Sequence, residues 1–440
     1  MKKFSITFVA LLFMVCTFLA PQTAAYTLPA EYVIHAKSAM LVSLDTGGIL
    51  YSKDCDVSTY PASLQKIMVA LIVLERETDF NRKITASDTA INSLLGTGAA
   101  IQNIKVGEEL SVLDLLHCLL IPSACDAANV LAEYYGGSTE NFVQIMNDRA
   151  AALGMVDTVY TNAHGLHDDQ QVTTAQDMLI LVQEALKYDL FLEICSKSRY
   201  TVEATNMSPQ RILVSTNFMM DKTTSYYNKN VKGIKTGYTD PAGRCLISTA
   251  ENDGARYLCI VMGCPLKDEN GNNVRYEFAD TQSLYTWAFN NLVTAQVVDP
   301  SRPIAEVKVE MAKQQDYMQL LPAEKLNAVI PKGAESSVII EKHLNSETVN
   351  APINKGDVLG YGIVKCAGEE LGRVDLVAAS SLERSSLLYS WSKIKAFFKN
   401  PIVIIIGCAI LLFLIIAVTL NIIHNRRRRK MRRVKSYQRK

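Results

Sequence analysis

Residues 401–423 form a stretch of 23 residues without a single charged side chain. A helix rises about 1.5 Å per residue, so this stretch is long enough to cross the hydrocarbon core of a bilayer, which is about 30 Å thick. Ten lysines and arginines follow between Arg426 and Lys440, and such residues stay on the cytoplasmic side. The sequence therefore predicts a single-pass transmembrane helix, a basic cytoplasmic tail over 424–440 that contacts membrane lipids, and an extracytoplasmic chain before them.

The N-terminus has the three parts of a secretory signal peptide. Lys2 and Lys3 precede an apolar run over residues 6–20, and the small residues Thr23-Ala24-Ala25 follow. This order is typical of a segment that is cleaved during export. We expect residues 1–25 to be removed from the exported protein.

Charge is unevenly distributed along the chain. Lys2, Lys3 and the ten basic tail residues are twelve of the 45 lysines and arginines, which leaves 33 against 44 acidic residues and a net charge of −11. Nucleic-acid binding needs a basic surface. The acidic extracytoplasmic part therefore argues against a nucleic-acid partner.

Ser63 and Lys66 form an S-x-x-K pair at the start of a predicted helix. Pro61 lies just ahead of an apolar, helix-forming run over residues 67–74, and proline favours a first helical turn. The positive helix end would stabilise charge on a serine oxygen, and the spacing puts Lys66 on the same face. A buried lysine near another cation loses its proton more easily and can then accept the serine proton. By itself the pair also fits a helix cap beside a solvated lysine.

Lys235-Thr236-Gly237 lies in a predicted edge strand over residues 231–238. Lys235 would supply the second cation near Lys66, and bare Gly237 would let a substrate peptide approach closely. The backbone N–H groups of Tyr238 and Ser63 would form an oxyanion hole. The alternative for this run is a simple hairpin entry. Two further strands, over residues 244–250 and 255–261 and joined by a turn at Asn252-Asp253-Gly254, are expected to complete an antiparallel meander.

The run Ser123-Ala124-Cys125 lies between these two segments of the chain. The order S-x-x-K, S-x-C, K-T-G resembles that of the serine-type D-alanyl-D-alanine carboxypeptidases, the low-molecular-weight penicillin-binding proteins. Further segments that resemble the family are residues 40–47, 161–166, 233–243 and 286–289.

This resemblance implies a role for each matching residue. Ser63 would be the nucleophile, Lys66 the general base and Ser123 a proton-relaying hydroxyl. The substrate would be bound by a second set: Cys125, Lys235, Thr236, Gly237, Tyr238 and Arg275. The implied reaction removes the terminal D-alanine from peptidoglycan stem peptides in the maturation of a bacterial cell wall, with β-lactams as inhibitors and with no cofactor and no metal.

Cys125 departs from the family, which usually has asparagine at this position. An amide both donates and accepts hydrogen bonds, whereas a thiol donates weakly. Cys125 could also be a small buried filler. Two other functions therefore stay open: a wall-associated penicillin-binding protein with weak or no carboxypeptidase activity, and a β-lactamase-like hydrolase. Against the latter, no E-x-x-L-N run occurs between Ser123 and Lys235.

The remaining chain is long enough for two domains. We expect an α+β catalytic domain over 26–292, in which helices flank an antiparallel sheet as in β-lactamases and transpeptidases, with a long helical stretch from Ser63 to about Asp157. Short alternating strands, such as the one over residues 305–310, predict a small all-β domain over 293–379. Residues 380–400 would form an amphipathic juxtamembrane segment at the outer interface.

Eight cysteines lie between Cys55 and Cys366, outside the predicted span. They contain no C-x-x-C pair or other metal-binding spacing, and several lie in apolar runs. Buried free thiols are expected rather than a disulfide framework.

Overall fold

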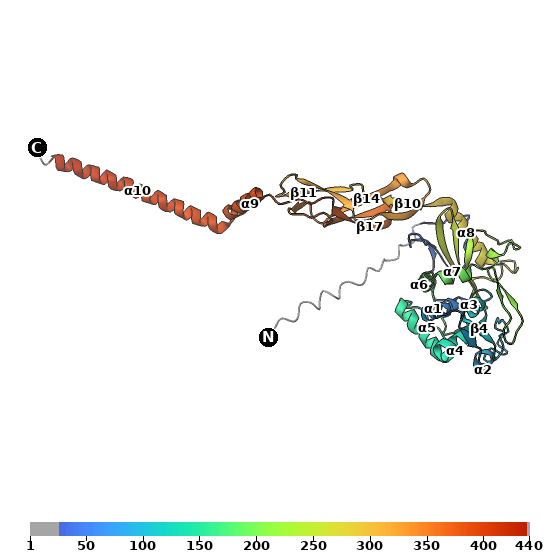
Figure 1. Ribbon diagram of the computed structural model, residues 1–440. Coiled ribbons are helices and arrows are strands. Elements are labelled where there is room, and N and C mark those ends of the chain that lie inside the picture. Colours follow the sequence, from blue (N-terminus) through green and yellow to red (C-terminus); the bar gives the residue numbers. More distant parts are fainter. Residues whose placement is uncertain (1–25, 438–440) are drawn as a thin grey trace, which may run out of the picture. The chain divides into compact units, whose positions relative to one another are not determined.

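The structure, a computed structural model, describes residues 26–437 (Figure 1). The predicted signal peptide, residues 1–25, lies outside the described residues. The described chain divides into two compact units. The first comprises residues 26–297 with Leu326–Ile339 and Val364–Gly372, and the second comprises Val298–Lys325, Ile340–Ile363 and the chain from Arg373 onward.

A five-stranded antiparallel sheet forms the centre of the first unit, in the order β2-β1-β9-β8-β7. Successive side chains of a strand point to opposite faces, so Ile260 enters one hydrophobic core and Val261 the other. Both faces are covered, which explains why the central strands read as nearly continuous apolar runs. The strands are β1 (Ser38–Ser43), β2 (Ile49–Lys53), β7 (Val231–Thr239), β8 (Gly243–Asn252) and β9 (Ala255–Cys264).

Helices cover the two faces of this sheet. One face packs on α8 (Tyr276–Asn291). The other packs against a helical group around α1 (Lys66–Arg76), which is buried from Lys66 to Leu74. The remaining helices are α2 (Asp88–Asn92), α3 (Val112–Leu120), α4 (Cys125–Gly136), α5 (Thr139–Leu153), α6 (Ala175–Ala185) and α7 (Asp189–Cys195).

The helical stretch predicted from Ser63 to about Asp157 is not continuous. The short antiparallel pair β3 (Lys83–Thr85) and β4 (Glu109–Ser111) interrupts it. Ser111 and Ser138 accept the N-terminal amides of α3 and α5, and Gly137 ends α4 in a left-handed conformation. These caps fix the helix ends. A second hairpin, β5 (Arg199–Val202) with β6 (Arg211–Val214), follows α7.

The C-terminal strands form a six-stranded sheet in the order β14-β16-β17-β12-β11-β15 and a separate pair, β10 with β13. Strand β11 alternates buried and exposed residues, as the sequence predicted for this segment. The strands are β10 (Leu292–Val298), β11 (Ala305–Glu310), β12 (Tyr317–Pro322), β13 (Leu326–Pro331), β14 (Val338–Leu344), β15 (Thr348–Asn350), β16 (Val358–Cys366) and β17 (Glu369–Ala378).

Two helices end the described chain. Helix α9 (Ser386–Lys399) has no buried residue, and its exposed side chains include Trp391 and Phe398. Helix α10 (Pro401–Tyr437) follows. Within the described residues, its segment Pro401–Arg428 is the one helix long and apolar enough to cross a membrane.

Candidate active site

Ser63 lies in a 3₁₀ turn, η1 (Ala62–Gln65), directly before α1, and is half-buried. The sequence predicted an α-helix starting near this residue; the observed turn is tighter, and Lys66 is the first residue of α1. The Nζ of Lys66 lies 2.9 Å from the Oγ of Ser63. The three-residue spacing therefore brings the two reactive groups into direct contact.

Lys66 is fully buried, and its Nζ contacts three groups: the Ser63 hydroxyl, the backbone carbonyl of His164 and the thiol of Cys125. Burial lowers the pKa of Lys66 from its usual value of 10.5. A lowered pKa favours the neutral amine, which can accept a proton. Burial of the His164 imidazole, and then the nearby charge of Lys66, lower the pKa of His164 to about 4.

Lys235, on β7, is also buried, and its Nζ donates to the Thr236 carbonyl at 2.9 Å. Burial and then the charge of Lys66 lower the pKa of Lys235 well below 10.5. Two buried amines in one site disfavour two positive charges. The sequence predicted that the charge of Lys235 lowers the pKa of Lys66; instead burial lowers the pKa of Lys66, and the charge of Lys66 acts on Lys235.

Ser123 and Cys125 lie at the start of α4. Ser123 has a left-handed backbone, with φ of 67°, and its buried Oγ has no hydrogen-bond partner in the described part of the chain. The Sγ of Cys125 lies 3.5 Å from Lys66 Nζ and 3.6 Å from the His164 carbonyl oxygen. Cys125 is therefore buried, as a filler would be, and also in contact with the predicted base.

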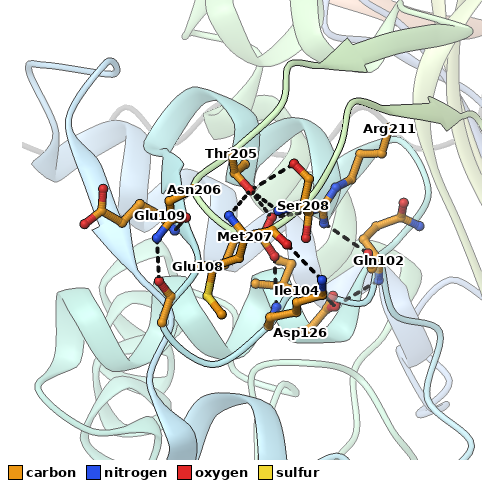
Figure 2. A network of polar contacts seen from close by, with 12 residues as sticks. Gln102, Ile104, Glu108, Glu109, Asp126, Thr205, Asn206, Met207, Ser208 and Arg211 are labelled. Carbon is orange, nitrogen blue, oxygen red and sulfur yellow. Dashed lines mark hydrogen bonds and ion pairs between the residues drawn. The ribbon is translucent and has the colours of Figure 1, made fainter.

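A buried polar network holds this turn in place (Figure 2). The backbone N–H of Cys125 donates to Ala100 at 2.8 Å. Asp126, the next residue, accepts the backbone N–H groups of Gln102 and Ile104 at 2.9 and 3.1 Å. Figure 2 shows dashed contacts from Gln102 to both Asp126 and Arg211.

Arg211, on β6, completes the network through an ion pair with Glu108, whose side chain is fully buried. Glu108 also accepts from the Thr205 hydroxyl at 2.8 Å and from the Lys105 backbone at 2.9 Å. Every oxygen of this carboxylate thus has a donor. The loop before β4 is clamped between α4 and the β5–β6 hairpin.

Strand β7 is the last strand in the sheet order, so within the described residues no further strand pairs with its outer edge. An unpaired edge can bind an extended peptide. Thr236 Oγ1 lies 2.5 Å from Thr216 Oγ1. A side chain at Gly237 would meet Leu64 Cγ at 3.2 Å and Pro61 O at 3.3 Å. The close approach that Gly237 permits is therefore to the chain's own Ser63 turn, whereas the sequence predicted an approach by a substrate peptide.

Arg275 lies at the N-terminus of α8 and bonds Glu277, with Nη1 3.1 Å from Oε1. It has no direct bond to Ser63, Lys66 or Lys235.

The sequence did not predict three neighbours of the site: the His164 carbonyl, the Thr216 hydroxyl and Arg244, which pairs with Tyr238 across β7 and β8. A backbone carbonyl leaves no sequence signal. Among the described residues, no cluster of three or more His, Cys, Asp or Glu side chains could hold a metal ion.

Comparisons with known proteins show which families and structures this chain resembles. The family model of D-alanyl-D-alanine carboxypeptidases matches residues 23–265, more than half of the chain, and the model of the penicillin-binding protein 5 C-terminal domain matches residues 294–384. The carboxypeptidase DacF of Bacillus subtilis is 29% identical over 83% of this chain and 92% of its own length. DacC of Escherichia coli is 28% identical over 80% and 85%. The crystal structure of penicillin binding protein 5 from Haemophilus influenzae superposes with a TM-score of 0.64, at 26% identity, over 82% of this chain and 100% of the other.

Proposed function

Since the chain belongs to the D-alanyl-D-alanine carboxypeptidase family, we propose that Ser63 is its nucleophile and Lys66 its general base. The protein is a serine D-Ala-D-Ala carboxypeptidase that acts on peptidoglycan stem peptides in cell-wall maturation. Both the family and the curated relatives favour this activity over a β-lactamase-like hydrolase or a binder without activity. The observation that carries the residue assignment is the 2.9 Å contact between Lys66 Nζ and Ser63 Oγ, made by a buried lysine with a lowered pKa.

In the first step, Ser63 Oγ attacks the carbonyl carbon between the two terminal D-alanines, and the serine proton moves to Lys66. The negative charge that develops on the carbonyl oxygen is stabilised by the backbone N–H groups of Ser63 and Tyr238. Ser123, whose buried hydroxyl is unpartnered among the described residues, relays the proton to the leaving amine. The C–N bond breaks, D-alanine departs, and an ester links the shortened peptide to Ser63.

Water then hydrolyses the ester. Lys66, neutral again, accepts the proton of the attacking water, the tetrahedral intermediate collapses, and Ser63 recovers its proton. β-Lactams mimic the terminal dipeptide and acylate the same serine. Lys235, Thr236 and Arg275 bind the substrate's carboxylate end, and Cys125 faces the substrate backbone where family members have an amide.

The C-terminal segments anchor the enzyme. Support comes from the apolar segment 401–423, within the helix long enough to cross a membrane, and from the basic residues that begin at Arg426. Under the positive-inside rule, such residues favour a cytoplasmic C-terminus. Helix α9, with exposed Trp391 and Phe398, lies at the outer interface beside membrane lipids. The small β-domain, residues 293–379, connects the catalytic domain, residues 26–292, to these anchoring segments.

The direct test is a D-alanine release assay on the detergent-solubilised full chain. A peptide ending in D-Ala-D-Ala should release free D-alanine, and a fluorescent penicillin should label the protein and leave it slowly. Rapid loss of the label without D-alanine release would instead identify a β-lactamase, and slow loss without release would identify a binder.

A further inference from the structure

Two arginines share one buried carboxylate on the α8 side of the sheet. The side chain of Glu277 is 3% exposed, and its Oε1 lies 3.1 Å from Arg275 Nη1 and 3.9 Å from Arg244 Nη1. Arg275 comes from the N-terminus of α8 and Arg244 from the start of β8. Glu277 therefore holds together two cations that are far apart in the sequence.

Each guanidinium also lies over an aromatic ring, that of Tyr238 on β7 or that of Phe218. The Cζ of Arg244 is 5.1 Å from the ring centre of Tyr238, and the Cζ of Arg275 is 4.7 Å from that of Phe218. Stacking on a ring restrains a guanidinium without using its N–H donors. Both arginines are thus oriented by an aromatic ring as well as by Glu277.

The side chains of Thr236 and Tyr238 lie on the same face of β7, because residues two apart in a strand do so. Thr236 contacts Thr216, and Phe218 follows Thr216 by two residues. Arg244 therefore lies over a ring two residues from Thr236 on β7, and Arg275 lies over a ring two residues from Thr216, the hydrogen-bond partner of Thr236. The side chains of Thr236 and Tyr238 lie on the face of β7 opposite to the side chain of Lys235.

The cluster of Arg244, Arg275 and Glu277 has unbalanced charge and polar atoms without a hydrogen-bond partner among the described residues. Two guanidinium groups face one carboxylate, which leaves an excess positive charge. The buried Nε of Arg244 and the buried Oε2 of Glu277 have no hydrogen-bond partner in the part of the chain that the structure describes. Guanidinium groups are the preferred partners of carboxylates, because their N–H donors match the two oxygens.

We propose that Arg244 is a second carboxylate-binding arginine of this enzyme and that Glu277 is the positioning residue that orients both Arg244 and Arg275. The inference rests on the proposed function and refines it: the pair selects peptides with a free terminal carboxylate over peptides whose chain continues. Arg244 would thereby favour release of a terminal D-alanine over cleavage of a cross-link.

The test compares two substrates on the full chain in detergent: a peptide ending in D-Ala-D-Ala and the same peptide with a C-terminal amide. The selectivity is the ratio of their kcat/KM values. This ratio does not depend on the concentration of active enzyme, so a variant that folds only in part still gives a valid result. The variants are Arg244→Gln, Arg244→Lys and Glu277→Gln. The matched control is Arg256→Gln on β9, which breaks an arginine pair with Asp45.

We expect Arg244→Gln to lower the selectivity roughly tenfold or more, because a charge-assisted hydrogen bond is lost with the acid only. The loss should appear mainly in KM. Arg244→Lys should restore part of it, Glu277→Gln should lower it, and Arg256→Gln should leave it unchanged.

If Arg244→Gln changes kcat/KM equally for the acid and the amide, so that their ratio is unchanged, the inference is overturned while the proposed activity stands. An unchanged ratio in Glu277→Gln would overturn the positioning role. A wild-type chain that releases no D-alanine would overturn the proposed function and this inference with it.

Discussion

The thiol of Cys125 lies 3.5 Å from the Nζ of Lys66, inside the group of atoms that surrounds the proposed base. The other members of that group are the Ser63 hydroxyl and the His164 carbonyl. Family members usually have an asparagine where this chain has Cys125. The substitution therefore changes a direct neighbour of the base rather than a remote packing position.

Replacing Cys125 with asparagine should raise activity. An amide donates and accepts stronger hydrogen bonds than a thiol, a difference of about 0.5–1.5 kcal/mol, which corresponds to a rise of roughly threefold to tenfold in kcat/KM. A D-alanine release assay measures kcat/KM for the wild-type chain and for Cys125→Asn. Cys259→Ser is the control, because Cys259 is equally buried but lies on β9 in the α8-side core. Unchanged kinetics in Cys125→Asn would show that the thiol has no part in the reaction.

The rate of Ser63 acylation should rise with pH. Lys66 must be neutral to accept the serine proton, and burial lowers its pKa below 10.5. A lowered lysine pKa means that the neutral form gains population as pH rises through that lower value. Stopped-flow penicillin acylation should therefore increase with pH and level off before the usual lysine pKa is reached. A midpoint at or above 10.5 would contradict the role of Lys66.

Removing Arg211 should destabilise the catalytic domain. Its partner Glu108 is fully buried, and an uncompensated buried charge costs about 3–5 kcal/mol. We expect Arg211→Met to lower the free energy of unfolding by this amount and the double variant with Glu108→Gln to recover part of it. Urea unfolding can be followed by the fluorescence of buried Trp287 in a Trp391→Phe background, since the chain has two tryptophans.

The control for that measurement is Arg256→Met. Arg256 pairs with Asp45, and its own side chain is 55% exposed, so the loss should be about 1 kcal/mol or less. If Arg211→Met and Arg256→Met destabilise equally, the buried network around Asp126 does not hold the Ser123–Cys125 turn as described.

The membrane orientation can be tested in spheroplasts. Protease added from outside should digest the catalytic domain and spare an epitope fused after Lys440. Truncation after Arg384 removes α9 and α10 and should release a soluble protein that still binds penicillin, because all proposed site residues precede Val297. An epitope that is digested from outside would reverse the assigned orientation.

Much of the site was readable from sequence because its chemistry depends on fixed spacings. A spacing of three residues from Ser63 to Lys66 is about one helical turn, and the contact follows from that alone. The turn at Asn252-Asp253-Gly254 likewise predicted the β8–β9 hairpin, and the alternation in Ala305–Glu310 predicted a half-buried strand. Local patterns of this kind need no knowledge of distant contacts.

Contacts between distant segments could not be predicted in this way. Arg244 and Glu277 meet because β8 packs on α8, and no periodicity links the two positions. The β5–β6 hairpin was missed, and so was the buried partnership of Arg211 with Glu108, because charged residues at these positions read as solvent-exposed. Gly237 was assigned to substrate approach, whereas the fold places the Ser63 turn against it.

The central claim, that Ser63 is acylated, is tested most directly by mass spectrometry. The full chain is incubated with benzylpenicillin and digested, and the peptide that contains Ser63 is examined for the penicilloyl adduct. We predict one adduct, on Ser63, in the wild-type chain and none in Ser63→Ala, with labelling in Lys66→Ala nearly as low because the two residues act as a unit. An adduct on another residue, or labelling that persists in Ser63→Ala, would contradict the account.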